Sequence, residues 1–253
     1  MLNIIILAAG RGSRLKKTTI DTPKGLIKIY KDKTLLDLQV KILKQFKNSK
    51  IIIVTGFQKN KIINKFKDEK FTFLFNKKWK KTNMLYSLYC ADKFLKKNSS
   101  LVLYSDILYS KEIISKIISN KKNLCVAYDA YWLNLWKKRF NKPELDAESF
   151  YINKYNQITE IGKKIKKNEI KKIKGQYMGI IKINPRAWKI VKNELNIEEI
   201  KKNHLTHMLD KIINKNIIPI YGVKNTKPWY EIDSNKDLRL AKNSIKSLYN
   251  NFE

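Results

Sequence analysis

Cysteine and histidine are scarce in this sequence, with only two residues of each type. Cys90 and Cys125 lie in apolar stretches without metal-ligand spacing, which predicts buried free thiols in a reducing cytoplasm. His204 and His207 stand three residues apart on a predicted helix with no third ligand in sight, so we expect surface or packing roles for both. This scarcity argues against a zinc site.

Long apolar runs, internal repeats and linkers are also missing. No apolar run reaches the length of a membrane span, and the first residues predict a strand instead of a signal peptide. No stretch rich in Gly, Ser or Pro divides the chain. We therefore expect a cytoplasmic protein without membrane insertion, folded as a single domain over residues 1–253 and present as a monomer or homodimer.

Acidic residues are few: 22 Asp and Glu against 54 Lys and Arg give a net charge of +32. Such a surplus raises the question of nucleic acid. The excess is nearly all lysine, however, spread along the whole chain without a helix-turn-helix, zinc-finger or RNP-type pattern. We expect a solvated lysine-rich surface that attracts small polyanions and no specific nucleic-acid partner, with a nucleic-acid-binding protein as the remote alternative.

Alternating apolar runs and amphipathic stretches predict an α/β fold. Strands are expected over residues 3–7, 51–55, 71–75, 101–106, 124–128, 176–183 and 217–223, with a hairpin over 150–161 and a short strand within 25–30. Helices are expected over residues 34–46, 58–66, 82–95 and 185–194, from about 110, and from 235. This alternation predicts a mixed, mostly parallel Rossmann-like sheet flanked by helices.

A glycine loop follows the first predicted strand, in the stretch LAAGRGSRLKKTTIDTPK. Gly10 and Gly12 let bare backbone approach a ligand, and successive N–H groups in such a turn suit an anion. Arg14 and Lys24 add a guanidinium and an ammonium group. A dinucleotide fingerprint would need a third glycine where Leu15 stands, and nothing in the chain fits a Walker loop. The stretch therefore predicts a polyphosphate site.

The string L-A-A-G-x-G-x-R-L followed by P-K resembles the signature of nucleotidyltransferases related to sugar-phosphate nucleotidylyltransferases. The later patterns A-Y-D-x-x-W, D-A-E and W-Y-E-I-D resemble the phosphocholine cytidylyltransferase branch of bacterial surface-glycan pathways. That branch includes enzymes for 2-aminoethylphosphonate and for phosphoglutamine, the latter in capsule synthesis. The resemblance implies the nucleotidyltransferase fold and CTP as the nucleotide.

Two carboxylates stand at predicted strand ends, where open α/β sheets bind ligands. Asp106 follows an apolar strand and Asp233 follows the string W-Y-E-I. Mg²⁺ prefers few carboxylates together with phosphate oxygens. The resemblance implies that Asp106 and Asp233 bind Mg²⁺, and capping of the helix that follows is the alternative for each.

The implied reaction is in-line attack of an acceptor phosphate or phosphonate on the α-phosphorus of CTP, with catalysis resting on Arg14, Lys24, Asp106 and Asp233. Asn83 and Ser87 open a predicted helix, where they could contact base or ribose or simply cap the helix. The expected nucleotide-binding residues are Leu7, Ala8, Ala9, Gly10, Arg11, Gly12, Ser13, Arg14, Asn83 and Ser87.

An acceptor-binding subregion is expected over about residues 130–183. Aromatic faces and carboxylates near Trp136 and Glu148 would attract an ammonium group, although the Trp residues could instead pack against the sheet. The resemblance implies that Lys163 binds the acceptor phosphate. The expected acceptor-binding residues are Asp129, Trp136, Glu148, Lys163, Tyr177 and Trp229. We expect phosphocholine, 2-aminoethylphosphonate or, slightly favoured, phosphoglutamine, with a sugar 1-phosphate used with UTP, TTP or GTP as the alternative.

Overall fold

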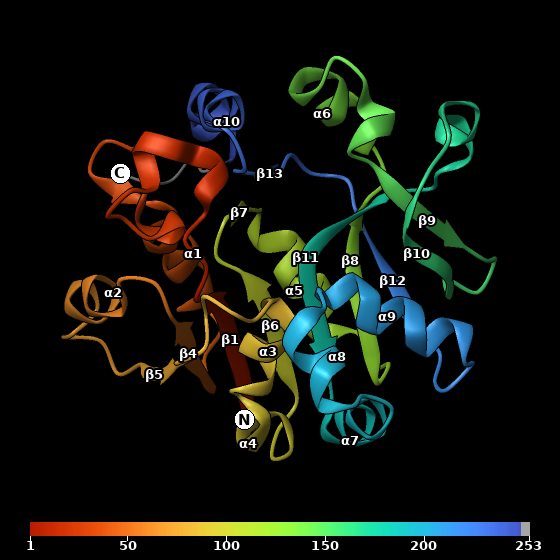
Figure 1. The fold of residues 1–253 in the computed structure, drawn as a ribbon, viewed down its shortest axis with the longest axis horizontal. Helices are drawn as coiled ribbons and strands as arrows, with labels where there is room; N and C mark the ends of the chain where they lie inside the picture. The colour runs from red at the N-terminus through yellow and green to blue at the C-terminus, as the bar shows by residue number, and fades with distance from the viewer. Residues whose placement is uncertain (249–253) are drawn as a thin grey trace.

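A seven-stranded sheet forms the centre of the computed structural model, which describes residues 1–248 (Figure 1). Its strand order is β12-β8-β11-β6-β1-β4-β5. All strands run in one direction except β11, which is antiparallel to both of its neighbours, so the predicted mixed, mostly parallel sheet is confirmed. The strands are β1 (Leu2–Ala8), β4 (Ser49–Thr55), β5 (Thr72–Phe75), β6 (Ser100–Tyr104), β8 (Leu124–Asp129), β11 (Gln176–Ile183) and β12 (Tyr221–Asn225).

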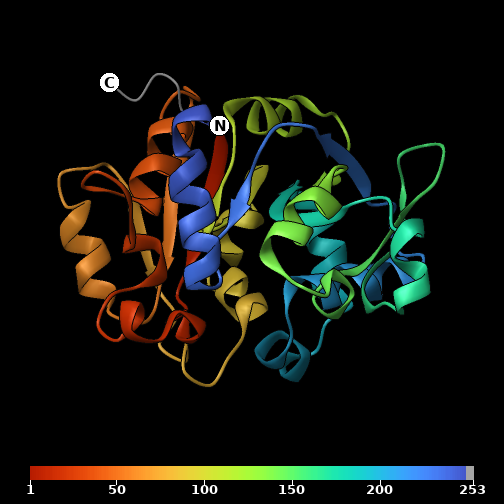
Figure 2. The same ribbon diagram turned by 90° about the horizontal axis from the view of Figure 1, so that it is seen from above.

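Helices cover both faces of this sheet, with α5 on one face and α8 and α9 on the other (Figures 1 and 2). The central strands are consequently buried on both sides, and Ile4, Ile5 and Ile6 of β1 have no exposed surface. The α-helices are α1 (Leu35–Leu43), α2 (Lys59–Lys65), α3 (Met84–Tyr89), α4 (Asp92–Leu95), α5 (Lys111–Ser119), α6 (Trp132–Arg139), α7 (Pro185–Asn193), α8 (Ile197–Lys202), α9 (Leu205–Asn214) and α10 (Asn235–Leu248).

Three small strand pairs surround the sheet. The predicted hairpin is present as β9 (Glu148–Ile152) and β10 (Ile158–Lys164). The pair β7 (Ile107–Leu108) and β13 (Tyr230–Glu231) joins the segment after β6 to the segment before α10. The third pair is β2 (Lys28–Tyr30) and β3 (Lys33–Thr34). The pairing of β7 with β13 joins chain positions more than a hundred residues apart just beyond the carboxyl end of β6.

Some element boundaries differ from the sequence prediction. The helix expected over residues 82–95 is split into α3 and α4, because Ala91 leaves helical geometry. The strand expected over residues 217–223 begins only at Tyr221. Asn216, with a φ of 50°, ends α9, and Pro219 has no N–H to give to a strand ladder. Residues 24–26 form a 3₁₀ turn, η2 (Lys24–Leu26), where the short strand was expected to begin.

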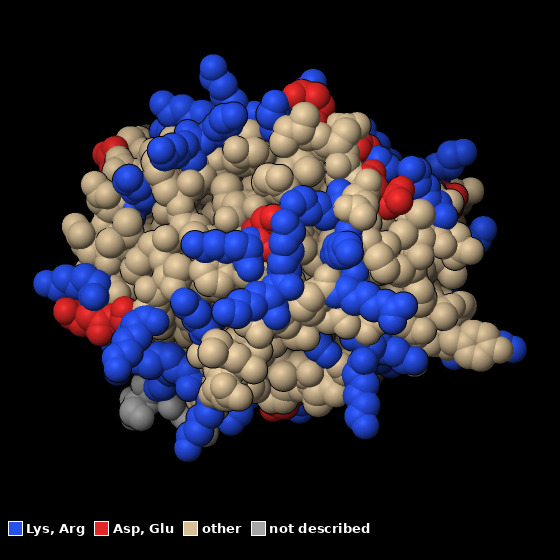
Figure 3. All heavy atoms as spheres, turned by 90° about the horizontal axis from the view of Figure 1, so that it is seen from below, with Lys and Arg blue, Asp and Glu red and all other residues tan. Residues whose placement is uncertain are grey.

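Lys and Arg side chains lie scattered over the face shown in Figure 3, with few acidic groups between them and no single basic stripe. Among residues 1–248, none of the helices combines the length and the apolar character that crossing a bilayer requires.

Candidate active site

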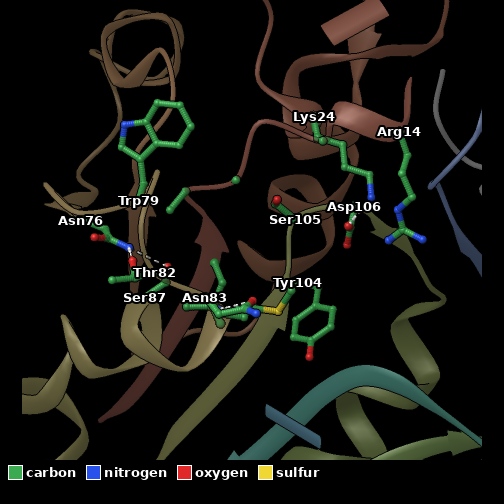
Figure 4. A pocket seen from close by; sticks show the side chains of 15 residues that line it. Arg14, Lys24, Asn76, Trp79, Thr82, Asn83, Ser87, Tyr104, Ser105 and Asp106 are labelled. Atoms are coloured by element: carbon green, nitrogen blue, oxygen red, sulfur yellow. Dashed lines mark hydrogen bonds and ion pairs between the residues drawn. The ribbon is translucent and has the colours of Figure 1, made fainter. Parts of the chain in front are cut away.

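The first cavity lies at the carboxyl ends of β1 and β6. These strands are parallel neighbours, with Leu7 opposite Tyr104, so the glycine loop after β1 and the segment Ser105–Asp106 after β6 emerge side by side. Together they border a cavity of about 210 Å³ (Figure 4). Its walls are formed by Leu7, Ala9, Gly10, Gly12, Arg14, Lys24, Asn76, Trp79, Thr82, Asn83, Met84, Ser87, Tyr104, Ser105 and Asp106.

The two ends of this cavity differ in chemistry. Trp79 and Asn76 lie at one end, and Lys24, Arg14 and Asp106 lie at the other (Figure 4). The Asn76 amide donates to the side-chain oxygens of Thr82 and Ser87, both at 3.1 Å, which fixes its orientation. One end therefore offers an aromatic face and an oriented amide, whereas the other is highly charged.

Lys24 is the centre of the charged end. Its Nζ atom lies 2.6 Å from Asp106 Oδ2 and 2.6 Å from Asp233 Oδ1. Burial alone would lower the pKa of Lys24, but the two carboxylates raise it to about 12. Burial would raise the pKa of Asp233, but Lys24 and Arg14 hold it below its usual range. Both partners of this contact are therefore charged at neutral pH.

Gly12 allows Lys24 to reach this position. Its φ of 75° is a left-handed conformation that favours glycine. A Cβ atom on Gly12 would lie 3.0 Å from three side-chain carbons of Lys24. The loop thus contributes both backbone donors and the space through which the lysine passes.

A second cavity of about 250 Å³ adjoins the first and shares Arg14, Met84, Tyr104 and Asp106 with it. Gly179, with a φ of 74°, lets the Tyr104 ring approach β11, where it meets Tyr177 edge to face. The other lining residues are Trp136, Asp146, Glu148, Gln176, Tyr177, Gly179, His204, Thr206, Glu231 and Asp233.

The second cavity is rich in acidic groups. Five carboxylates line it, while Arg14 is its only Lys or Arg among the described residues. Burial raises the pKa of Asp146 and Glu148, and it raises the pKa of Glu231 to about 7 with the help of the nearby Asp233. In a chain with a net charge of +32, this local excess of acid suits a ligand that carries a positive group.

The structure brings together the four residues predicted to be catalytic. Arg14 Nη2 lies 2.9 Å from Asp233 Oδ1, and Lys24 joins Asp233 to Asp106. Seven of the expected nucleotide-binding residues line the first cavity, namely Leu7, Ala9, Gly10, Gly12, Arg14, Asn83 and Ser87. Three others do not: Ala8 is buried in β1, the Arg11 guanidinium lies over the Phe57 ring, and Ser13 opens η1 (Ser13–Thr19).

The expected acceptor-binding residues are divided. Trp136, Glu148 and Tyr177 line the second cavity. Asp129 and Trp229 lie outside both cavities, where the indole Nε1 donates to Asp129 Oδ2 at 2.8 Å. Lys163 also lies outside, because its Nζ atom pairs with Glu160 at 3.2 Å and approaches Asp210 at 3.8 Å. Asp129, Trp229 and Lys163 therefore do not line the second cavity.

Several lining residues were absent from the predicted sites. Asn76, Trp79 and Thr82 carry no motif signal of their own. The pairing of β5 with β4 and the packing of α3 against β1 place them at the first cavity. His204, expected at the surface or in packing, lines the second cavity because it is the N-cap of α9 facing α3. Its Nε2 atom lies 3.0 Å from Asn83 Nδ2, and burial lowers its pKa.

A divalent cation could be held only with help from a ligand. Among the described residues, no group of three or more His, Cys, Asp and Glu side chains is arranged to bind a metal ion. Asp106 Oδ1 is nevertheless buried without a hydrogen-bond partner in the described part of the chain, and Asp233 is joined to it through Lys24. Two carboxylates fit a hard cation whose other ligands are phosphate oxygens and water.

This chain is similar to several nucleotidyltransferases. A family model described as MobA-like NTP transferase domain matches residues 4–141. The CTP:phosphoglutamine cytidylyltransferase of Campylobacter jejuni is 32% identical to this chain, covering 94% of it and 98% of that protein. The solved CTP:phosphocholine cytidylyltransferase of Streptococcus pneumoniae aligns with a TM-score of 0.70 at 20% identity, covering 97% of this chain and 99% of that one. An inositol-1-phosphate CTP transferase of T. maritima aligns with a TM-score of 0.72 at 19% identity, covering 96% of each chain. At these identities, the two structural likenesses show the fold.

Proposed function

The chain belongs to the family of MobA-like NTP transferase domains, and we propose that it is a cytidylyltransferase that joins CMP from CTP to a small phosphorylated amino compound. The predicted place in the nucleotidyltransferase superfamily, in its phosphocholine cytidylyltransferase-like branch, is confirmed. The observation that carries the proposal is the meeting of the two cavities beside the cluster of Lys24, Asp106 and Asp233. A nucleotide and an acceptor in neighbouring cavities would meet at that cluster.

The first cavity fits a nucleoside triphosphate. The Arg14 guanidinium lies at its charged end (Figure 4), and the backbone of the loop around Gly10 lines the same cavity, so both can donate to phosphate oxygens. At the other end, the Trp79 ring offers a stacking face. The Ser87 hydroxyl, which accepts from the Asn76 amide, can donate to a base edge. CTP as the preferred nucleotide is supported by the cytidylyltransferase relatives.

The proposed reaction needs no covalent intermediate with the enzyme. An acceptor phosphate oxygen attacks the α-phosphorus in line, the bond to the β-phosphate oxygen breaks, and pyrophosphate leaves. Lys24 Nζ moves from the carboxylates to the α-phosphate oxygens and neutralises their charge, while Arg14 holds the leaving pyrophosphate. Asp106 and Asp233 would hold Mg²⁺, which supplies further neutralisation at the reacting phosphate.

The second cavity fits an acceptor with an ammonium group. Asp146 and Glu148 provide carboxylates, and Trp136 provides an aromatic wall. Phosphoglutamine is the favoured acceptor because the similar Campylobacter jejuni enzyme is named for it, with phosphocholine and 2-aminoethylphosphonate next. We assign the reaction to capsule or surface-glycan biosynthesis in the cytoplasm.

Measurement of pyrophosphate release tests this function. CTP, UTP, TTP and GTP are each combined with phosphoglutamine, phosphocholine, 2-aminoethylphosphonate and glucose 1-phosphate. The expected result is the highest kcat/KM for CTP with one of the three amino acceptors. A higher kcat/KM for glucose 1-phosphate with any nucleotide would instead assign the chain to sugar-1-phosphate nucleotidylyltransferases.

A further inference from the structure

Arg139 is a buried arginine beside the candidate active site. It is the last residue of α6, and its side chain is only 1% exposed. The other buried basic residues among those with described side chains are Lys24, at the centre of the site, and Lys182. Burying a guanidinium group is costly unless carboxylates compensate its charge. The carboxylates around Arg139 therefore show how its charge is compensated.

Three carboxylates surround the Arg139 guanidinium. Its Nε atom donates to Asp237 Oδ1 at 3.0 Å, and its Nη1 atom donates to Glu231 Oε2 at 3.2 Å. Its Nη2 atom lies 3.6 Å from Asp233 Oδ2 and has no closer hydrogen-bond partner among the described residues. The guanidinium thus donates hydrogen bonds to Asp237 and Glu231, and its Nη2 atom lies within ion-pair distance of Asp233.

A second route from Arg139 to Asp233 runs through the backbone. The other oxygen of Asp237, Oδ2, accepts the N–H of Asp233 at 3.1 Å and the N–H of Ser234 at 2.8 Å. The Ser234 hydroxyl in turn accepts the N–H of Asp237 at 3.2 Å, which completes a capping box at the start of α10. Asp233 is therefore oriented from its backbone and from its Oδ2 side. Its Oδ1 atom remains directed at Lys24 and Arg14.

Arg139 also contacts the acceptor side of the site. Its guanidinium carbon lies 4.9 Å from the centre of the Trp136 ring and 5.0 Å from that of Phe140. Trp136 lines the acidic cavity and donates through Nε1 to Asp146 Oδ2 at 3.1 Å. The Arg139 side chain therefore contacts both the Asp233 carboxylate and the aromatic wall of the second cavity.

We propose that Arg139 is a positioning residue of the reaction, holding Asp233 so that its Oδ1 atom faces the reacting phosphate. This inference rests on the proposed function. Arg139 touches neither the nucleotide cavity nor the acceptor cavity, and it acts through Asp233, Asp237 and Trp136. Lysine could keep the charge at this position but not the planar fork that reaches three carboxylates at once.

The test compares two variants, Arg139→Lys and Arg239→Lys. Arg239 is an exposed arginine on α10, and its substitution is the matched control. For Arg139→Lys we expect kcat to fall by about tenfold or more with KM for CTP within about twofold, because the loss lies in the orientation of Asp233 and not in nucleotide binding. We also expect Mn²⁺ binding in the presence of CTP, followed by electron paramagnetic resonance without acceptor, to weaken by about tenfold. Arg239→Lys should change neither.

A double variant that combines Arg139→Lys with Asp233→Asn tests whether Arg139 acts through Asp233. If Arg139 acts through Asp233, adding Arg139→Lys to Asp233→Asn should lower kcat by less than about twofold further. Full additivity would overturn the inference. So would a lower Tm for Arg139→Lys with unchanged kcat and Mn²⁺ binding, since that result describes a purely structural residue. Near-normal activity of Asp233→Asn alone would instead remove the role of Asp233 in the proposed function.

Discussion

The nucleotide side and the acceptor side of the site are built in different ways. The first cavity is lined by residues between Leu7 and Asp106, mostly from segments that follow β1, β5 and β6. The second cavity, apart from the wall it shares with the first, draws on segments between Trp136 and Asp233 that come from a helix, a hairpin, β11, α9 and β13. Backbone donors and fixed charges in one stretch can bind phosphate, whereas an acceptor pocket needs side chains from many elements.

The largest expected effect lies where the two cavities meet. Asp106→Asn and Asp233→Asn should each lower kcat/KM by about a hundredfold or more, because each removes a hard anionic ligand and a partner of Lys24. Steady-state kinetics over a range of Mg²⁺ concentrations, with circular dichroism to verify folding, checks this. Near-wild-type turnover of either variant at limiting Mg²⁺ would contradict the assignment of that residue.

Gly12→Ala tests the local construction of the nucleotide side. The new Cβ atom would lie 3.0 Å from the Lys24 side chain in a left-handed backbone, so we expect kcat to fall by about tenfold and stability to fall by about 1–2 kcal/mol. Thermal unfolding and kinetics measure the two effects. Gly10→Ala is the matched control for stability, because a Cβ atom there meets nothing within 4 Å. Equal unfolding temperatures for the two variants would refute the steric argument.

Ser87→Ala and Glu148→Gln should separate the two cavities kinetically. Ser87 accepts from the Asn76 amide in the first cavity, and its loss should raise KM for CTP by about fivefold. Glu148 lies in the acidic cavity, and its neutralisation should raise KM for the amino acceptor by about tenfold. Each variant should leave the other KM within about twofold. A Glu148→Gln variant with a raised KM for CTP and an unchanged acceptor KM would reverse the assignment of the cavities.

The smallest effect is expected at Lys163. The resemblance implied a phosphate-binding role for this lysine, but its ammonium pairs with Glu160 and Asp210 outside the second cavity. Lys163→Ala should therefore leave KM for the acceptor within about twofold, because the lysine does not line the second cavity. The loss of its surface ion pairs should also change the stability of the fold little. Acceptor saturation curves at fixed CTP provide the measurement. A tenfold rise in acceptor KM would restore the role that the resemblance implied.

The order and type of most elements could be predicted from the sequence, because buried parallel strands read as continuous apolar runs. The runs that became β1, β4 and β6 are examples. The direction of β11 could not be predicted, since an apolar run has the same composition whichever way it crosses the sheet. The start of β12 at Tyr221 could not be predicted either, because it depends on where Asn216 ends the preceding helix.

For the site, the sequence alone determined the glycine loop, the basic side chains of Arg14 and Lys24, and the carboxylates Asp106 and Asp233. Their chemistry is carried by residue type and short spacing, which do not depend on distant contacts. Only the tertiary structure decided that Trp79 lines the first cavity and that Arg139 lies beside the charged cluster. The same holds for the placement of Trp229 and Lys163 outside both cavities. The physical reason is that side-chain direction depends on packing between elements far apart in the chain. Composition and spacing carry no record of that packing.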